Sequence, residues 1–199
     1  MTGQHPKGFT LIEVMLALGL GALTLGAMYT IYLAQSRNQI VQEDIVEMQQ
    51  TARAVMALLV RELNMAGFDP RGVNRDATSA NDFFGVTGDA TQLTIKADLN
   101  GNGRPTNSNE SIVYSYDAAT STIRRNTGGG RQPVGEHIKA LTFQYLDNQG
   151  RPTTMAKKIR QVSIMVKTST KRPDPRYSKN HGFRTFTLRL RVTPRNLSL

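Results

Sequence analysis

The carboxylate of Glu13, near the start of the chain, lies in a setting that is unusual for a charged group. Glu13 is followed by an apolar run, residues 14–34, that contains no charged residue. An ionised carboxylate in the hydrocarbon of a bilayer costs at least about 2.5–3.5 kcal/mol, so we expect a cation at the same depth to pair with it. Cleavage between Gly8 and Phe9 would create such a cation, because it would leave an α-amino group on Phe9. The pattern predicts electrostatic pairing for Glu13, and not catalysis.

The features around this junction follow a fixed order: a short basic leader, a Gly-Phe pair, an acid and the apolar run. The stretch 7–13, Lys-Gly-Phe-Thr-Leu-Ile-Glu, resembles the class III signal of type IV pilins and type II secretion pseudopilins. The resemblance implies that a prepilin peptidase cuts after Gly8 and methylates Phe9. It also implies that Glu13 pairs with the N-terminus of a neighbouring subunit during assembly. An ordinary secretory signal is cut after its apolar region. A signal anchor with a chance acidic residue is the remaining alternative.

The long apolar segment predicts a helix that continues beyond a membrane. Residues 9–34 would cover about 39 Å at 1.5 Å per residue, more than the hydrocarbon thickness of about 30 Å. Residues 35–67 predict an amphipathic continuation, because apolar side chains recur every three or four positions between Val41 and Ala66. Most charged residues, Glu62 among them, are expected off this stripe. Gly67 supplies the left-handed position that ends a helix.

Residues 68–199 change to short alternating runs that are separated by turn residues, which is typical of antiparallel strands. We expect strands near residues 93–97, 111–117, 121–126, 138–146, 159–167 and 186–192. The glycine-rich stretch 128–131 predicts a flexible hairpin tip. The predicted fold class is α+β and pilin-like, with a long N-terminal helix packed on a C-terminal antiparallel sheet. The predicted organisation is a cleaved leader (residues 1–8), a transmembrane or filament-core helix (9–34), an amphipathic helix (35–67) and a β-rich globular domain (68–199).

Charge is distributed unevenly along the chain. The 199 residues carry a net charge of +10 and no cysteine, which excludes a disulfide framework. Residues 151–199 hold 13 Lys and Arg but one acid, Asp174. Such a basic quarter indicates contact with an acidic partner: another subunit, lipid head groups, polysaccharide or nucleic acid. A solvated strand face is the alternative. The candidate acidic-partner surface comprises Lys171, Arg172, Arg176, Lys179, Arg189 and Arg191.

One loop has the spacing of a calcium site. Asp98, Asn100 and Asn102 place oxygen side chains at alternate positions, with glycine at the sixth. The twelfth position, where a bidentate glutamate is expected, is Asn109, and Glu110 follows one residue late. The flanking segments are predicted strands and not helices, so the loop is not an EF-hand. Some pseudopilins bind calcium in their globular domain, but an Asn- and Gly-rich loop without metal is the alternative. We therefore expect either no cofactor or calcium.

No pattern in the sequence indicates an enzyme. The mature chain would keep two histidines, His137 and His181, and neither has the spacing of a catalytic triad or a metal site. The stretch 128–131 lacks the lysine and the helix that a phosphate-binding loop requires.

A second resemblance narrows the predicted function. The helix end 58–68, the strand 143–147 and the stretch 159–162 resemble PilW-type minor pilins and J pseudopilins of type II secretion. This implies a minor type IV pilin that assembles through its N-terminal helix and helps to initiate or cap a pilus. A J-type pseudopilin is the first alternative, and a DNA-binding minor pilin of an uptake pilus is the second.

The resemblance also implies partners and a location. The partners would be other minor and major pilins or pseudopilins, the prepilin peptidase, an inner-membrane assembly platform and membrane lipid, with nucleic acid a less favoured partner. The chain would cross the bacterial inner membrane once, with the C-terminal domain outside the cytoplasm. It would then move to the tip of a pilus or pseudopilus at the cell surface.

Overall fold

The structure, a computed structural model, describes residues 8–73 and 82–197. Gly8 is the one residue of the predicted leader, residues 1–8, that lies inside the described ranges. A single helix, α1 (Leu11–Leu63), precedes all the strands. The chain divides into two compact units between Glu43 and Asp44, and each unit is described below by itself.

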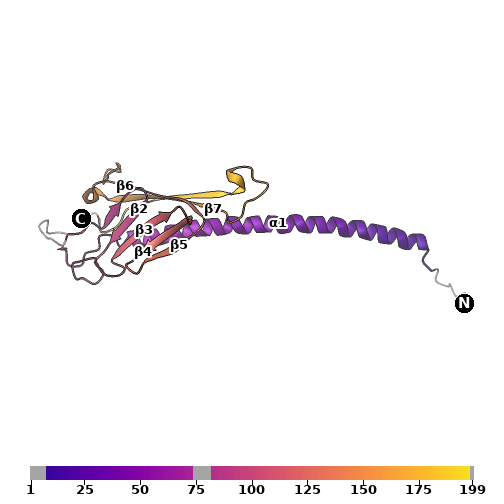
Figure 1. The fold of residues 1–199 in the computed structure, drawn as a ribbon, viewed down its shortest axis with the longest axis horizontal. Coiled ribbons are helices and arrows are strands. Elements are labelled where there is room, and N and C mark those ends of the chain that lie inside the picture. Colours follow the sequence, from indigo (N-terminus) through magenta and orange to yellow (C-terminus); the bar gives the residue numbers. More distant parts are fainter. Residues whose placement is uncertain (1–7, 74–81, 198–199) are drawn as a thin grey trace, which may run out of the picture. The chain divides into compact units, whose positions relative to one another are not determined.

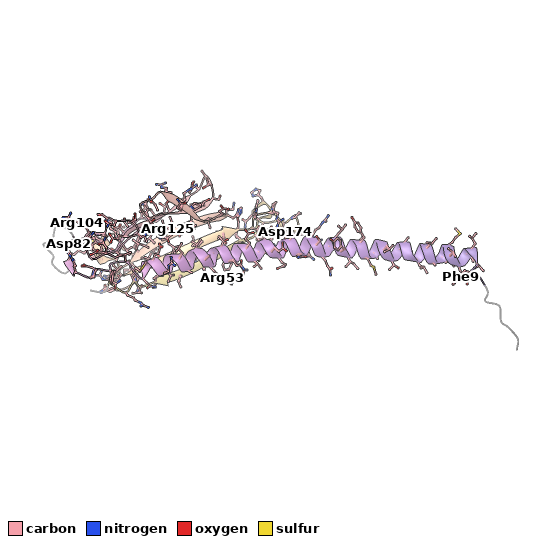
Figure 2. All side chains as sticks on the ribbon, turned by 90° about the horizontal axis from the view of Figure 1, so that it is seen from below. Phe9, Arg53, Asp82, Arg104, Arg125 and Asp174 are labelled. Atoms are coloured by element: carbon pink, nitrogen blue, oxygen red, sulfur yellow. The ribbon has the colours of Figure 1, made fainter. Side chains whose placement is uncertain are left out.

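The first unit consists of the N-terminal part of α1. Its apolar side chains, such as Leu16, Leu23 and Ile31, are exposed. Figure 2 shows side chains on both sides of the ribbon from Phe9 onward. A helix that is apolar on every side needs lipid or other helices around it. Within the described residues, α1 is also the one helix whose length and composition would allow it to cross a membrane.

The second unit contains two antiparallel sheets and the rest of α1 (Figure 1). The five-stranded sheet has the order β1-β2-β3-β4-β5, and the three-stranded sheet has the order β6-β7-β8. The strands of the first sheet are β1 (Val86–Gly88), β2 (Gln92–Lys96), β3 (Ser111–Asp117), β4 (Thr122–Asn126) and β5 (Arg131–Gly135). Those of the second are β6 (Ile138–Leu146), β7 (Gln161–Ser169) and β8 (Thr185–Val192). Two short 3-10 turns, η2 (Ala156–Lys158) and η3 (Asn180–Gly182), flank β7 and β8.

The apolar stripe of α1 packs on the sheets as predicted. Its buried members are Met48, Ala52, Val55, Leu59 and Leu63, followed by Ala66 beyond the helix. They join one core cluster with the inward side chains of both sheets. The prediction for Glu62 was wrong, because its side chain is buried and only 1% of the residue is exposed. Asp44, at the start of the second unit, is buried as well. Both acids have arginine partners, described below.

Two hydrogen bonds connect the sheets through β6. The hydroxyl of Tyr145 donates to the carbonyl of Gln92 at 2.7 Å, and the N–H of Phe143 donates to the carbonyl of Ala90 at 2.9 Å. Burial raises the pKa of Tyr145, so its hydroxyl stays protonated and remains a donor. The predicted fold class, a long helix packed against antiparallel strands, is confirmed. The division of the strands into two sheets was not predicted.

All six predicted strands are present. The hairpin of β3 and β4 and both ends of β6 match the prediction closely, while β7 begins two residues later than predicted. The edge strands β1 and β5 were missed, and β5 includes Pro133. Gly67 has a φ of 76°, which confirms its left-handed position after the helix.

Candidate functional site

The N-terminal end of α1 is organised by two side chains, Thr10 and Glu13. The backbone N–H and the hydroxyl of Thr10 both donate to Oε2 of Glu13 at 2.8 Å. The N–H of Glu13 donates back to the hydroxyl oxygen of Thr10 at 3.3 Å. This reciprocal arrangement is a capping box, which satisfies N–H groups that have no partner within the helix. The Thr-x-x-Glu spacing is the sequence signal of this box, and the capping role of Glu13 was not predicted from it.

The Gly8–Phe9 bond lies outside the helix that this cap begins. Residues 8–10 are not helical, and α1 starts at Leu11. Phe9 is 89% exposed. A peptidase needs an extended and accessible backbone, so the junction is suited to cleavage. Its cleavage and the methylation of Phe9 remain predictions.

Glu13 has no cation beside it in the described residues. Its hydrogen bonds there are to Thr10, and no ion pair within residues 8–73 and 82–197 includes it. The next charged residue along the helix is Arg37, more than six turns away. In a membrane, the second carboxylate oxygen of Glu13 would therefore need a cation from another chain or from its own new N-terminus.

A buried ionic cluster fixes the C-terminal end of α1 to the five-stranded sheet. The hydroxyl of Tyr114, on β3, donates to Oε2 of Glu62. Arg125, on β4, donates to Oε1 of Glu62 from Nε at 2.9 Å, and its terminal nitrogen lies 2.7 Å from the same oxygen. Burial, followed by the hydrogen bond to Glu62, raises the pKa of Tyr114, while the hydrogen bond to Glu62 raises that of Arg125. The cluster therefore keeps Arg125 charged and Tyr114 neutral.

A second ion pair fixes the start of the packed helix. Arg172, in the loop after β7, donates to both carboxylate oxygens of Asp44 at 3.1 Å and 2.8 Å. These hydrogen bonds lower the pKa of Asp44, although burial opposes the shift. Close by, the hydroxyl of Thr168 donates to the carbonyl of Met48 at 3.1 Å. Arg172, predicted as part of an acidic-partner surface, thus has an acidic partner within its own chain.

The six residues of that predicted surface lie in two separate parts of the structure. Lys171, Arg172, Arg176 and Lys179 lie in the loop between β7 and β8, where the buried Asp174 accepts hydrogen bonds from the backbone N–H of Arg176 and from the side chain of Arg184. The hydrogen bonds from Arg184 hold the pKa of Asp174 below its usual range. Arg189 and Arg191 lie on β8 instead. Both are exposed, and in the described ranges neither forms an ion pair.

The predicted calcium loop is closed by its own carboxylates. Oδ1 of Asp98 accepts the N–H groups of Gly101 and Asn102 at 2.9 Å and 3.1 Å, and Oδ2 accepts that of Gly103 at 2.8 Å. Oε1 of Glu110 accepts two further N–H groups, those of Leu99 and Asn100 at 3.1 Å each.

These N–H donors compensate both buried carboxylates. The side-chain oxygens of Asn100 and Asn102 also accept backbone N–H groups, at 2.9 Å and 2.7 Å. Asn109 is exposed, with a positive φ of 68°. Across residues 8–73 and 82–197, no three His, Cys, Asp or Glu side chains are placed to hold a metal together. The loop geometry therefore does not require a cation, and calcium binding stays a prediction.

Comparisons with known proteins agree with the N-terminal geometry. The family profile of the prokaryotic N-terminal methylation motif matches residues 4–29. Among solved structures, a type IV-like pilin from Thermus thermophilus is 12% identical, with a TM-score of 0.45, over 77% of this chain and 98% of that protein. None of the curated proteins compared matches the chain in sequence.

The methylation motif and the long helix overlap at the N-terminal end of the chain. The methylation motif covers the junction, Glu13 and most of the apolar run, and the helix it starts continues into a unit of antiparallel strands. The chain therefore carries a prokaryotic N-terminal methylation motif, and this motif is the feature by which it resembles prepilins. The motif and the apolar helix are compatible with membrane anchoring.

Proposed function

We propose that this protein is a minor type IV pilin that enters a filament through α1 and helps to initiate or cap it. The observation that carries the proposal is the position of Glu13, without a cation in the described residues and followed by a charge-free helical run. A neighbouring subunit whose N-terminal amine reached Glu13 would provide the missing charge. Electrostatic pairing in a low-dielectric medium is strong enough to select this contact over a mismatched one.

The proposal includes processing and location. Prepilin peptidase would cut between Gly8 and Phe9 and methylate Phe9, while the chain crosses the inner membrane with its C-terminal unit outside the cytoplasm. An assembly platform would then move it into the pilus, where it would stay near the tip with other minor and major pilins. The choice of a minor subunit is based on the resemblance of residues 58–68 and 143–147 to minor pilins.

The decisive experiment separates cleavage from assembly. Glu13→Ala should be cleaved and methylated normally, as measured by mass spectrometry of the mature N-terminus, but should support few pili by electron microscopy. Glu43→Ala is the matched control, because it removes an exposed acid from the same helix. Normal piliation with Glu13→Ala would contradict the proposal. A native chain that keeps its encoded methionine would contradict it independently.

Two other functions use related features. A J-type pseudopilin of a type II secretion system would need the same helix and junction, and co-purification with secretion components would favour it over a pilin. Arg189 and Arg191, exposed on β8, favour a DNA-binding pilin as the third candidate. Binding through phosphates would weaken steeply with salt, and failure to retard DNA even at low salt would remove that candidate.

A further inference from the structure

The last strand, β8, is a long and regular edge strand. It pairs with β7 over eight consecutive residues, from Thr185 to Val192, with no shift of register. In the described part of the chain, β7 is its one strand partner. Figure 1 shows it as the long yellow arrow. An edge of this kind presents unpaired backbone N–H and C=O groups that can template another strand.

The other sheet edges in residues 8–73 and 82–197 are blocked in recognised ways. β1 has three residues, and β5 contains Pro133 and pairs with β4 through a register shift. β6 has a register shift of its own, and its Phe143 and Tyr145 form backbone hydrogen bonds with Ala90 and Thr153, which lie outside the sheet. Short length, proline, bulges and covering segments all prevent strand addition. β8 has none of these features.

The apolar side chains on the core-facing side of β8 are only partly covered. Leu188 and Leu190 pair with Val166 and Ile164 of β7, both fully buried. Leu188 is half-buried, but Leu190 is 42% exposed. The apolar row of the sheet therefore continues onto its edge strand without cover, and one more strand would bury it.

The opposite face of β8 is positively charged. Arg189 and Arg191 pair with Met165 and Ser163 of β7, and Lys167 lies further along the same face. The three cations form no ion pair within the described residues, and no acidic residue lies on this face of β7 or β8. An added strand would place its own side chains directly opposite these arginines, where opposite charges attract and like charges repel.

We propose that β8 accepts an extended segment of a partner protein by strand addition, and that this segment alternates acidic and apolar residues. The acids would lie opposite Arg189 and Arg191, and the apolar side chains would cover Leu190. Backbone hydrogen bonds would supply binding free energy, while the alternation of side chains would supply selectivity. A neighbouring filament subunit is one source of such a segment, but the binding itself does not depend on the proposed pilin function.

A second copy of β8 fits this edge less well than an acidic strand. Two antiparallel β8 strands centred on Leu190 would place Arg189 of one copy opposite Arg191 of the other. Like charges directly opposite one another are destabilising. The arginines therefore disfavour self-pairing while they favour an acidic strand.

The test measures peptide binding to the full chain in neutral detergent. A short labelled peptide of alternating valine and glutamate is titrated by fluorescence anisotropy, and hydrogen exchange of residues 185–192 is measured with and without it. We expect saturable binding with protection of alternate β8 amides. A matching valine and lysine peptide should bind at least about tenfold more weakly. The double variant Arg189→Glu and Arg191→Glu should reverse this preference.

The controls distinguish strand addition from non-specific electrostatic binding of the peptide. Lys157→Glu with Lys158→Glu removes two exposed cations from η2 and should leave both affinities unchanged. N-methylation of the peptide on alternate residues should abolish binding without altering its charge. Absence of peptide binding, or binding without protection of the β8 amides, would overturn the proposal. So would protection of the β8 amides without peptide that increases with protein concentration, because it would indicate pairing between two copies of β8. A DNA duplex that binds more tightly than the peptide, and whose binding the arginine variants abolish, would overturn it as well.

Discussion

The cluster of Glu62, Tyr114 and Arg125 should determine how firmly the helix end is attached to the five-stranded sheet. The side chain of Glu62 is 2% exposed and that of Arg125 is 24% exposed, while Tyr114 is fully buried. Arg125→Met would leave the buried carboxylate with one neutral donor, the Tyr114 hydroxyl, and with the exposed Arg61 at 4.0 Å. Removal of one partner from a buried pair destabilises a protein by about 3–5 kcal/mol. Since the guanidinium is partly exposed and water can replace some of its interactions, we expect the lower end, about 3 kcal/mol.

Substitutions of the other cluster members should destabilise the protein by less than Arg125→Met does. Tyr114→Phe removes one hydrogen bond to a charged group but keeps the ion pair, so it should destabilise by about 1.5 kcal/mol. The triple variant Glu62→Leu, Tyr114→Phe and Arg125→Met leaves no buried polar atom of the cluster unpaired. Apolar replacement of a whole buried pair is often neutral, so the triple variant should lie within about 1 kcal/mol of the wild type. The triple variant should therefore be more stable than Arg125→Met alone.

The free energy of unfolding can be measured by pulse proteolysis of the detergent-solubilised full chain in a denaturant series. Arg124→Met, one residue away on β4, is the matched control. Its pair with Asp117 is at the surface, with side chains 28% and 31% exposed, and should contribute less than about 1 kcal/mol. Equal destabilisation by Arg124→Met and Arg125→Met would refute the reasoning, as would a triple variant less stable than Arg125→Met.

Three further predictions follow from individual contacts. The pKa of Asp44 is lowered by its hydrogen bonds to Arg172, so its contribution to stability is present above the unfolded value of about 3.9 and is lost as pH falls through the folded value; Asp44→Asn should flatten that loss in acid unfolding curves, and an unchanged slope would contradict it. Gly67→Ala should destabilise by about 1–2 kcal/mol in the same denaturant assay, because φ is 76° and a Cβ would lie 2.8 Å from Cδ2 of Leu197; a stability equal to wild type would be the contrary result. If the loop at Asp98 binds calcium, millimolar calcium should raise the melting temperature of the wild type but not that of Asp98→Asn, and no rise in the wild type would remove calcium from consideration.

The sequence predicted most elements because their patterns depend on neighbouring residues. The helix, its glycine end, the β3–β4 hairpin and β6 all follow from local periodicity and turn chemistry. β5 was missed because Pro133 and the preceding glycines lack strand alternation. It exists because β4 provides an edge to pair with, and proline is tolerated on an edge strand.

The buried charges could not be predicted, because their partners are distant in the sequence. Arg125 lies 63 residues from Glu62, and Arg172 lies 128 residues from Asp44. Periodicity predicts that a charged residue faces outward, and only the tertiary structure shows that an arginine reaches each buried carboxylate. For the same reason, the sequence did not reveal that the six basic residues are divided between the loop after β7 and the exposed side of β8.

We infer that the two buried acids, Asp44 and Glu62, and their arginine partners select one register for the packed part of α1. Asp44 and Glu62 are separated by about five turns at 3.6 residues per turn, so they lie on the same side of the helix. The apolar stripe between them repeats every three or four residues, and such a stripe would tolerate a slide by one turn with little loss of burial. The ion pairs would not tolerate it, because a slide would bury both carboxylates without cations. Apolar residues thus provide most of the packing free energy between the helix and the sheets. Asp44 and Glu62 select which of several similar registers forms.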